Sequence, residues 1–246
     1  MKKRVVLLRV GVDSGCGGIQ GPLFANGTFE FICIPDKKGV SNDTYGNMFG
    51  RDGKPLVRYF PLSKREKLAE QCVHVDPEFE TFTYGDPTTP KSGLRTLKPG
   101  DLLVFYCGLQ RWDEERRWDN GHRPALYLVG FFEVSLAGIA CDFDKRVLES
   151  QFGENFHVRH SSVFEEQKNH LVLVKGGPGS RVFRKAALIS VEDKDRRGRP
   201  LKVLSSGMQR VFGTFGSDIV SVQRSNPRWV EPHFVDKAVE FVKALV

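Results

Sequence analysis

An uninterrupted apolar run at residues 102–106, Leu-Leu-Val-Phe-Tyr, constrains the fold of this chain more than any other feature of its sequence. Strands with two buried faces have this continuous apolar pattern, whereas half-exposed strands alternate apolar and polar residues. The turn residues 98–101, Lys-Pro-Gly-Asp, come directly before the run. A second apolar run at residues 125–134 can pair with it. The two runs therefore predict a buried central pair of strands.

Shorter patterns predict the elements around this pair. We expect further strands at residues 4–12, 28–34, 171–174, 187–191 and 201–204. Ser63 and Glu66 have the spacing of a capping box, which predicts a helix from there to about residue 72. Asp142 or Asp144 is expected to cap a short helix that follows. Apolar residues recur at helical spacing over residues 235–246, which predicts an amphipathic helix at this end.

The order of these patterns indicates the fold class. Strands outnumber helices, the two kinds of element do not alternate regularly, and no internal repeat is visible. The sequence therefore predicts an α+β fold, with a single domain over residues 1–246 on a bent mixed sheet or β-barrel. Peripheral helices and a C-terminal helix complete it. Every apolar run is shorter than the about 20 residues that a membrane-spanning helix needs, so no membrane partner is expected.

Composition narrows the class of protein. The 246 residues include 37 Lys and Arg against 30 Asp and Glu, and 40% are hydrophobic, which argues against a disordered chain. The net charge of +7 is compatible with an anionic partner such as nucleic acid. The five cysteines are odd in number, widely spaced and without a CxxC pair, so no disulfide framework is expected. With no export signal recognised, the expected location is the cytoplasm.

The central strands carry a resemblance to a known superfamily. Residues 97–106 contain the proline-glycine-aspartate turn and its apolar strand, and residues 126–134 return with a glycine before an aromatic and an acidic residue. This segment resembles the PUA-like superfamily, which includes EVE, ASCH and YTH domains. The resemblance implies a β-barrel core at about residues 95–205. It also implies binding of RNA or of modified bases in DNA, with the base enclosed by aromatic side chains.

A second resemblance covers most of the chain. It rests on residues 9–14, 29–35, 74–79, 83–87, 176–183 and 226–228. Together these segments resemble the third family of nucleotide-modification-associated domains. The resemblance implies a protein of a DNA-base modification or defence system, in a nucleic-acid setting. It assigns no catalytic residue.

Four carboxylates are the candidate catalytic residues. Asp13 lies where a strand opens into a glycine-rich loop, and Asp76, Glu78 and Asp86 lie near Pro77 and Pro87, which stiffen the backbone around them. Clustered acids can transfer protons or bind a hard cation. The alternative is that each acid is solvated or caps its own turn.

No metal site or cofactor is predicted. His157 and His160 are three residues apart and would need His170 or Asp144 to complete a metal site. Such pairs arise by chance, and no HExxH motif is present, so zinc is not favoured. The sequence identifies no cofactor.

A glycine-rich segment is the candidate phosphate site. Gly177 and Gly179 would expose backbone amides, Ser180 can donate a hydrogen bond, and Arg181 can bind phosphate oxygens with its forked guanidinium group. The segment lacks the Lys-Ser/Thr pair of a P-loop. A plain hairpin turn beside a surface arginine is the alternative.

The remaining candidate nucleic-acid or nucleotide contacts are aromatic, basic or hydroxyl side chains. Aromatic residues can stack a base and arginines can contact its backbone, although half of such aromatics would simply belong to the core. Arg197 and Arg199 belong to an Arg-Gly-Arg-Pro segment that suits a narrow minor groove or an ordinary solvated turn. The other candidates are Ser14, Tyr84, Tyr106, Arg111 and Trp112.

Three functions remain open from the sequence. The first is a nucleic-acid-associated protein of a base-modification or defence system, which binds a nucleotide or an extruded or modified base; whether it also modifies that base is left open. DNA is favoured over RNA as its partner. The second is an enzyme that acts on a free nucleotide or sugar phosphate through the carboxylate cluster. The third is a scaffold without a ligand.

Overall fold

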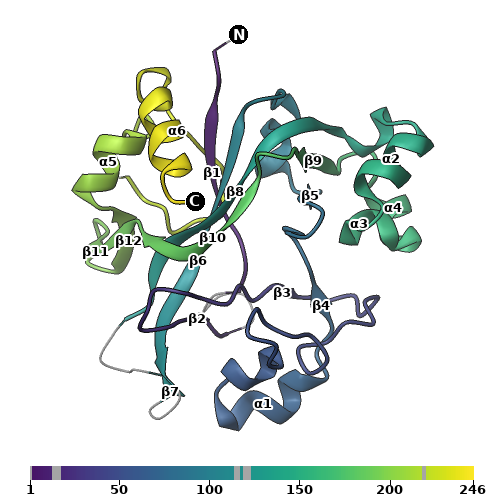
Figure 1. Ribbon diagram of the computed structural model, residues 1–246, viewed down its shortest axis with the longest axis horizontal. Helices are drawn as coiled ribbons and strands as arrows, with labels where there is room; N and C mark the ends of the chain where they lie inside the picture. The colour runs from purple at the N-terminus through teal and green to yellow at the C-terminus, as the bar shows by residue number, and fades with distance from the viewer. Residues whose placement is uncertain (1, 13–17, 114–116, 119–122, 218–219) are drawn as a thin grey trace.

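The computed structural model describes residues 2–12, 18–113, 117–118, 123–217 and 220–246 (Figure 1). Within these residues, nine strands form one mixed sheet with the main order β13-β1-β6-β8-β9-β5. Along this order the strands are β13 (Arg228–Trp229), β1 (Val5–Arg9), β6 (Leu102–Asp113), β8 (Ala125–Ile139), β9 (Val172–Gly176) and β5 (Thr83–Asp86). Three further strands join at the side: β10 (Arg181–Leu188) pairs with β8, and β2 (Gly21–Leu23) and β7 (Arg117–Trp118) pair with β6.

The central strands confirm the prediction from the two apolar runs. β6 and β8 pair antiparallel from Leu102↔Glu133 to Leu109↔Ala125, with a register shift after Phe105. β6 also pairs in parallel with β1, and its first residues are fully buried. The second half of β8 pairs with β9 after another register shift. β8 thus extends from one part of the sheet to another, and the described strands form an open, bent mixed sheet rather than a closed barrel.

Helices lie on two sides of the central strands (Figure 1). α5 (Ser206–Phe212) and α6 (Val235–Lys243) lie near β1, while α2 (Lys145–Phe152), α3 (Phe156–Arg159) and α4 (Ser161–Gln167) lie beyond β9. α1 (Leu62–Ala69) lies at the bottom of the view, with the small pair β3 (Ile34–Pro35) and β4 (Val73–His74) above it. A second small pair joins β11 (Ser190–Lys194) to β12 (Pro200–Leu204). Short 3-10 helices are Leu56–Tyr59, Thr89–Thr96, Ala140–Asp142 and Pro232–Phe234.

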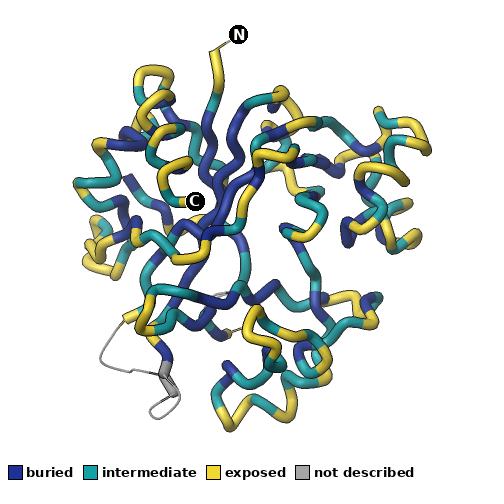
Figure 2. The backbone as a smooth tube through the Cα atoms, in the orientation of Figure 1, coloured by how far each residue is buried: buried dark blue, intermediate teal, exposed yellow. Residues whose placement is uncertain are grey.

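The buried residues form a large main core and two smaller ones (Figure 2). The main core lies along the central strands and includes Val235, Ala238 and Val242 of α6. Their spacing gives this helix one apolar face, which explains why it packs on the sheet. The second core lies in the N-terminal half of the chain and contains Tyr59 and Trp112.

The helix predictions had mixed outcomes. The side chain of Asp144 caps α2 by accepting a hydrogen bond of 2.8 Å from the backbone N–H of Val147, as predicted. The C-terminal helix is also confirmed as α6. The predicted helix near residue 63 is present as α1, but the prediction of a capping box is wrong. α1 begins at Leu62 with Pro61 at its N-cap, and no side chain caps it. Among the described residues, no helix has the length and apolar character that a membrane span requires.

The strand predictions away from the centre were less accurate. Residues 28–34 do not form a continuous strand, since they contain only a bridge from Phe29 to Leu23 and the start of β3. The expected strand at 187–191 is divided, because Ala187 and Leu188 end β10 and β11 begins at Ser190. Sequence analysis missed most of β10, whose burial follows no strict alternation.

Candidate functional site

Two cavities lie on either side of residues 73–78, the segment formed by β4 and the four residues after it. His74 and Asp76 line a cavity of about 490 Å³, which we call the polar cavity. Val75, Pro77 and Glu78 line a second cavity of about 570 Å³, which we call the apolar cavity. Residues 74 to 77 alternate between the two cavities, as neighbouring residues of an extended chain do, so one short segment supplies part of both walls.

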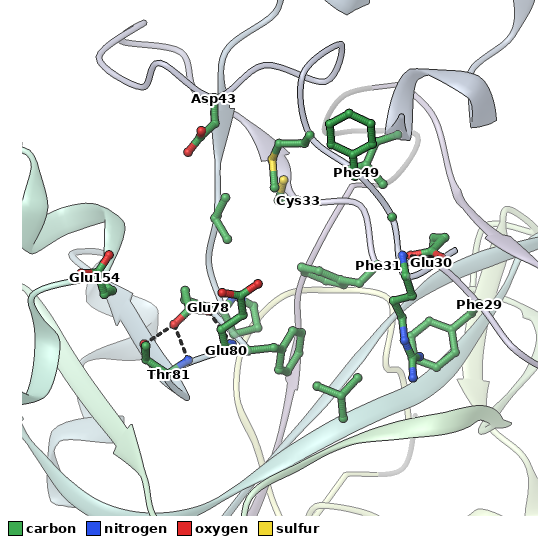
Figure 3. Close-up of a pocket in the computed structure, with 18 of the residues that line it drawn as sticks. Phe29, Glu30, Phe31, Cys33, Asp43, Phe49, Glu78, Glu80, Thr81 and Glu154 are labelled. Carbon is green, nitrogen blue, oxygen red and sulfur yellow. Dashed lines mark hydrogen bonds between the residues drawn. The ribbon is translucent and has the colours of Figure 1, made fainter. Parts of the chain in front are cut away.

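The apolar cavity is the larger of the two, and aromatic rings form part of its walls (Figure 3). Charged side chains also line it, among them Glu30, Asp43, Arg51, Glu80, Glu154 and Arg159. Phe31 and Phe79 pack edge to face with ring centroids 5.3 Å apart. The carboxylate of Glu78 accepts hydrogen bonds from the backbone N–H groups of Glu80 and Thr81 and from the Thr81 hydroxyl. Glu78 therefore stabilises its own turn, as Figure 3 shows for the contacts with Thr81.

The polar cavity is formed where several elements meet. Its lining residues come from the end of β1 (Arg9), β3 (Ile34), β4 (His74), β5 (Tyr84, Gly85, Asp86), the 3-10 helix Thr89–Thr96 (Lys91), α3 (His157), α4 (Gln167) and the segment that holds Gln223 and Ser225. Ionisable, amide and hydroxyl groups therefore converge on one space. Such convergence in a cavity of this size is typical of small-molecule sites.

Two imidazoles and a carboxylate form a buried cluster in this cavity, which we call the His-Asp-His cluster: His74, Asp76 and His157. Asp76 Oδ2 lies 3.5 Å from His157 Nε2 and 3.9 Å from His74 Nε2. One potential ligand atom from each side chain lies within 4.8 Å of the others. Among the described residues, neither Nε2 atom has a hydrogen-bond partner. The cluster therefore brings together three groups whose polar atoms face one another.

The backbone around β5 positions this cluster. The N–H of Gly85 donates to Asp76 Oδ2 at 2.9 Å. A Cβ atom at Gly85 would lie only 2.7 Å from His157 Cδ2 and 2.9 Å from Asn155 Oδ1, so glycine is needed for this close approach. Asn155 is fully buried, accepts from the backbone N–H of His157 at 3.1 Å and donates to Thr83 Oγ1 at 3.3 Å.

Contacts with neighbouring side chains orient both imidazoles. His157 Nδ1 lies 2.7 Å from Gln167 Oε1. Because an amide oxygen only accepts, Nδ1 carries the proton and donates it in this bond. His74 stacks on Phe156 with ring centroids 3.8 Å apart. Each ring is thus held by a second residue that lies outside the His-Asp-His cluster.

Burial changes the proton affinities in this cluster. It raises the pKa of Asp76 to about 6, although His157 and the Gly85 N–H act in the opposite direction. Burial and the neighbouring His157 lower the pKa of His74 to about 3, so this ring is neutral at pH 7. The low-dielectric surroundings thus disfavour charge on both residues.

A second hydrogen-bonded group lies beside the His-Asp-His cluster. Asp86 Oδ2 accepts from Lys91 Nζ at 2.7 Å and from the Tyr84 hydroxyl at 3.1 Å, while its other oxygen accepts from the Thr88 N–H at 2.7 Å. Burial raises the pKa of Tyr84 well above its usual value, so this residue remains a hydroxyl donor. Arg9 borders the same cavity and donates to the backbone carbonyl of Gln223. Two cationic side chains therefore line the polar cavity.

The structure brings together some of the residues that the sequence singled out. Asp76, Tyr84 and Asp86 all line the polar cavity, whereas Glu78 lines the apolar one. Asp13 and Ser14 lie outside the described residues. Their proposed roles toward a ligand remain predictions.

Of the predicted base contacts, Tyr106, Trp112 and Arg111 are not part of the polar cavity, whereas Tyr84 is. Tyr106 is fully buried, and its hydroxyl donates to the carbonyl of Val222 at 3.0 Å. Trp112 is also buried and packs against Tyr59 with ring centroids 5.1 Å apart. Arg111 is exposed on β6. The first two side chains therefore serve the core in this structure.

The predicted phosphate-binding segments form turns. Gly177 and Gly179 lie between β9 and β10, and the buried Ser180 hydroxyl accepts from the Glu133 N–H at 3.1 Å. Arg181 donates to the carbonyls of Pro178 and Ser180, each at 2.6 Å. In the turn between β11 and β12, Arg199 pairs with Asp195 at 2.7 Å, and the backbone N–H of Arg197 donates to the same carboxylate. Their contact with phosphate remains a prediction.

Sequence reasoning missed most of the His-Asp-His cluster. His74 and Asp76 are two apart in an extended segment, a spacing that places both side chains on one face and could have indicated a pair. His157 was instead grouped with His160, which packs against Phe156 and is not part of the cluster. Gln167 and Lys91 had no sequence signal, because only the fold brings them to the cavity.

Comparison with known families shows which family the chain belongs to. The family model for nucleotide modification associated domain 3 matches residues 4–243. The chain therefore belongs to this family, as the sequence resemblance suggested. No curated protein and no solved structure matches the chain at a significant level.

Proposed function

We propose that the chain is an enzyme of nucleotide modification that takes one nucleotide unit of DNA into the polar cavity. The observation that carries this proposal is the convergence of the His-Asp-His cluster with Lys91 and Arg9 on one cavity. Ionisable groups buried together at a cavity are characteristic of sites that carry out chemistry. Family membership supports nucleotides as the substrate class.

The two parts of the cavity suit two parts of a nucleotide. Lys91 and Arg9 supply positive charge for a phosphate, and the amides and hydroxyl of Gln167, Gln223 and Tyr84 can bind polar edges of a base or sugar. The His-Asp-His cluster then lies at the reacting group. The net charge of +7 favours a polyanion over a free nucleotide as the source of this unit.

Binding of labelled single-stranded DNA, double-stranded DNA, single-stranded RNA and a mononucleotide tests the proposal. We expect Lys91→Gln to weaken DNA binding by roughly tenfold to a hundredfold, because it removes a charge-assisted contact of about 1.5–3 kcal/mol. Glutamine can still donate a hydrogen bond to Asp86, which limits the structural effect. Lys145→Gln is the matched control, since that lysine side chain is 88% exposed on α2.

The same titrations decide between this proposal and its alternatives. At two salt concentrations about fourfold apart, binding to a DNA strand falls steeply, whereas binding of a free nucleotide changes little. A nucleotide that binds alone, with weak salt dependence, would favour the enzyme on free nucleotides. If Arg181→Gln weakens binding and Lys91→Gln does not, phosphate is held at the turn between β9 and β10, and the assignment to the polar cavity is wrong.

A further inference from the structure

The His-Asp-His cluster has the composition of a metal site. Two imidazole nitrogens and one carboxylate oxygen converge, and these are donors that divalent zinc and iron accept. Ligand atoms about 2.1 Å from one such ion lie about 3 to 3.5 Å from each other. The separation of 3.5 Å between Asp76 Oδ2 and His157 Nε2 has this value, and that of 3.9 Å to His74 Nε2 is slightly longer.

The hydrogen bond between His157 Nδ1 and Gln167 determines the tautomer of the His157 ring, and therefore whether Nε2 carries a proton or a lone pair. His157 Nδ1 donates to Gln167 Oε1 at 2.7 Å, so a neutral ring has no proton on Nε2. Nε2 lies 3.5 Å from Asp76 Oδ2, and an ionised carboxylate is itself an acceptor. Two acceptors that face each other in a buried place repel unless a proton or a metal cation lies between them. Histidine ligands of metals usually have such a partner on their other nitrogen.

Burial strengthens this argument. The side chains of His157 and Asp76 are each only 4% exposed, and that of His74 is 17% exposed. Nε2 of both histidines lacks a hydrogen-bond partner among the described residues. Buried polar atoms are normally satisfied. One ion would satisfy both nitrogens and the carboxylate oxygen at once.

The surroundings suit an ion that also binds something in the cavity. Asp76 is anchored by the Gly85 N–H, and the two rings are held by Gln167 and Phe156. Three protein ligands leave further coordination positions of zinc or iron open, as in catalytic metal sites. All three side chains line the polar cavity, so these positions face the space proposed for the nucleotide.

We propose that His74, Asp76 and His157 bind one divalent transition-metal ion, which presents its open coordination positions to the polar cavity. Magnesium and calcium are disfavoured because they prefer oxygen ligands. The ion would hold a water molecule or a substrate oxygen. Its role in chemistry rests on the proposed function, whereas metal binding itself is measured without any nucleotide.

The test is uptake of Co²⁺ and Zn²⁺ by the full chain after chelation and removal of metal. We expect the native sequence to bind one ion per chain and to give a visible absorption band with Co²⁺. Asp76→Asn and His157→Gln should each abolish this band. His170→Gln is the matched control, since His170 is exposed and outside the cluster. Circular dichroism and unfolding of the metal-free variants show whether each one is folded.

Gln167→Leu gives a second test. It distinguishes a role of Gln167 in metal binding from a role in stability alone. Gln167 Oε1 lies 2.7 Å from His157 Nδ1, so loss of this partner should weaken Co²⁺ binding by roughly 10-fold to 100-fold. The stoichiometry and the absorption band should be preserved at saturating metal. A folded protein with normal Co²⁺ affinity after this change would contradict the role assigned to the His157–Gln167 bond.

Either of two results overturns the inference. If the metal-free chain takes up no Co²⁺ or Zn²⁺, or if His157→Gln takes up as much as His170→Gln does, the cluster is not a metal site. DNA binding that depends on Lys91 but is unchanged by chelation would then leave the proposed function intact. Metal uptake without DNA or nucleotide binding would have the opposite meaning, because it supports the metal site and refutes the function.

Discussion

The polar and the apolar cavity share a wall at residues 73–78, yet their carboxylates behave differently. Asp76 faces two imidazoles in the polar cavity and accepts from the Gly85 N–H. Glu78, two residues further on, uses both oxygens to accept hydrogen bonds within its own turn. The chemistry of a carboxylate in this chain thus depends on what it faces. This difference supports the proposal that the polar cavity is the functional site, whereas Glu78 stabilises its own turn.

The largest effect on stability is expected in the apolar cavity. Phe79→Ala removes a ring that packs against Phe31, Phe105 and Phe132. The free energy of unfolding should fall by about 3 kcal/mol, measured by chemical denaturation, because truncation of a packed phenylalanine leaves a void. Co²⁺ uptake and DNA binding below the unfolding temperature should be unchanged. A folded Phe79→Ala protein that has lost DNA binding would show that the apolar cavity is part of the site.

A smaller effect is expected from the carboxylate that stabilises the turn. Glu78→Gln keeps one acceptor oxygen but removes the charge that two backbone N–H groups and a hydroxyl contact. The free energy of unfolding should fall by about 1 kcal/mol, as measured in urea. No change in stability, combined with weaker nucleotide binding, would reverse the roles given to the two carboxylates.

The smallest expected effect is a pH dependence of the free energy of unfolding, which arises from Glu30 in the wall of the apolar cavity. Burial raises the pKa of Glu30, even though the Arg51 N–H donates to it at 2.8 Å. An acid with a raised pKa in the folded state contributes stability below its unfolded pKa, and this contribution is lost as pH rises through the folded pKa. Glu30→Gln should therefore gain stability relative to the native sequence as pH rises.

Urea unfolding of both proteins at about pH 4 and about pH 8 measures this difference. Other titrating groups are common to the two proteins, so the change in the difference reports Glu30. A difference that is the same at both pH values would mean that this carboxylate is not disfavoured by burial.

The parts of the fold that follow from local pattern were predictable. Residues 102–106 and 125–134 are continuous apolar runs, and they form the paired strands β6 and β8. Asp144 precedes its helix with the side chain that a cap needs, and it caps α2. The strand predicted at residues 28–34 was wrong because its aromatic residues pack irregularly. Phe29 belongs to the main core, Phe31 packs against both the main and the smaller N-terminal core, and both line the apolar cavity.

The site was predictable only in part, because its residues are far apart in the chain. Asp76, Glu78 and Asp86 were predicted as a possible carboxylate cluster; Asp76 and Asp86 line the polar cavity, whereas Glu78 lines the apolar one. His157 is 81 positions after Asp76, and the contact between them depends on how α3 packs against β5. Local spacing cannot encode such a contact, so the sequence grouped His157 with its neighbour His160. The need for glycine at position 85 is likewise visible only after His157 is placed.

The most direct test of the account compares Asp76→Asn with Glu78→Gln for Zn²⁺ uptake by the metal-free protein. The two changes remove the same charge two residues apart, one on each side of the wall between the cavities. We predict that Glu78→Gln binds one ion per chain like the native sequence and that Asp76→Asn binds none. Equal uptake by both variants would contradict the central claim that the His-Asp-His cluster makes the polar cavity the functional site.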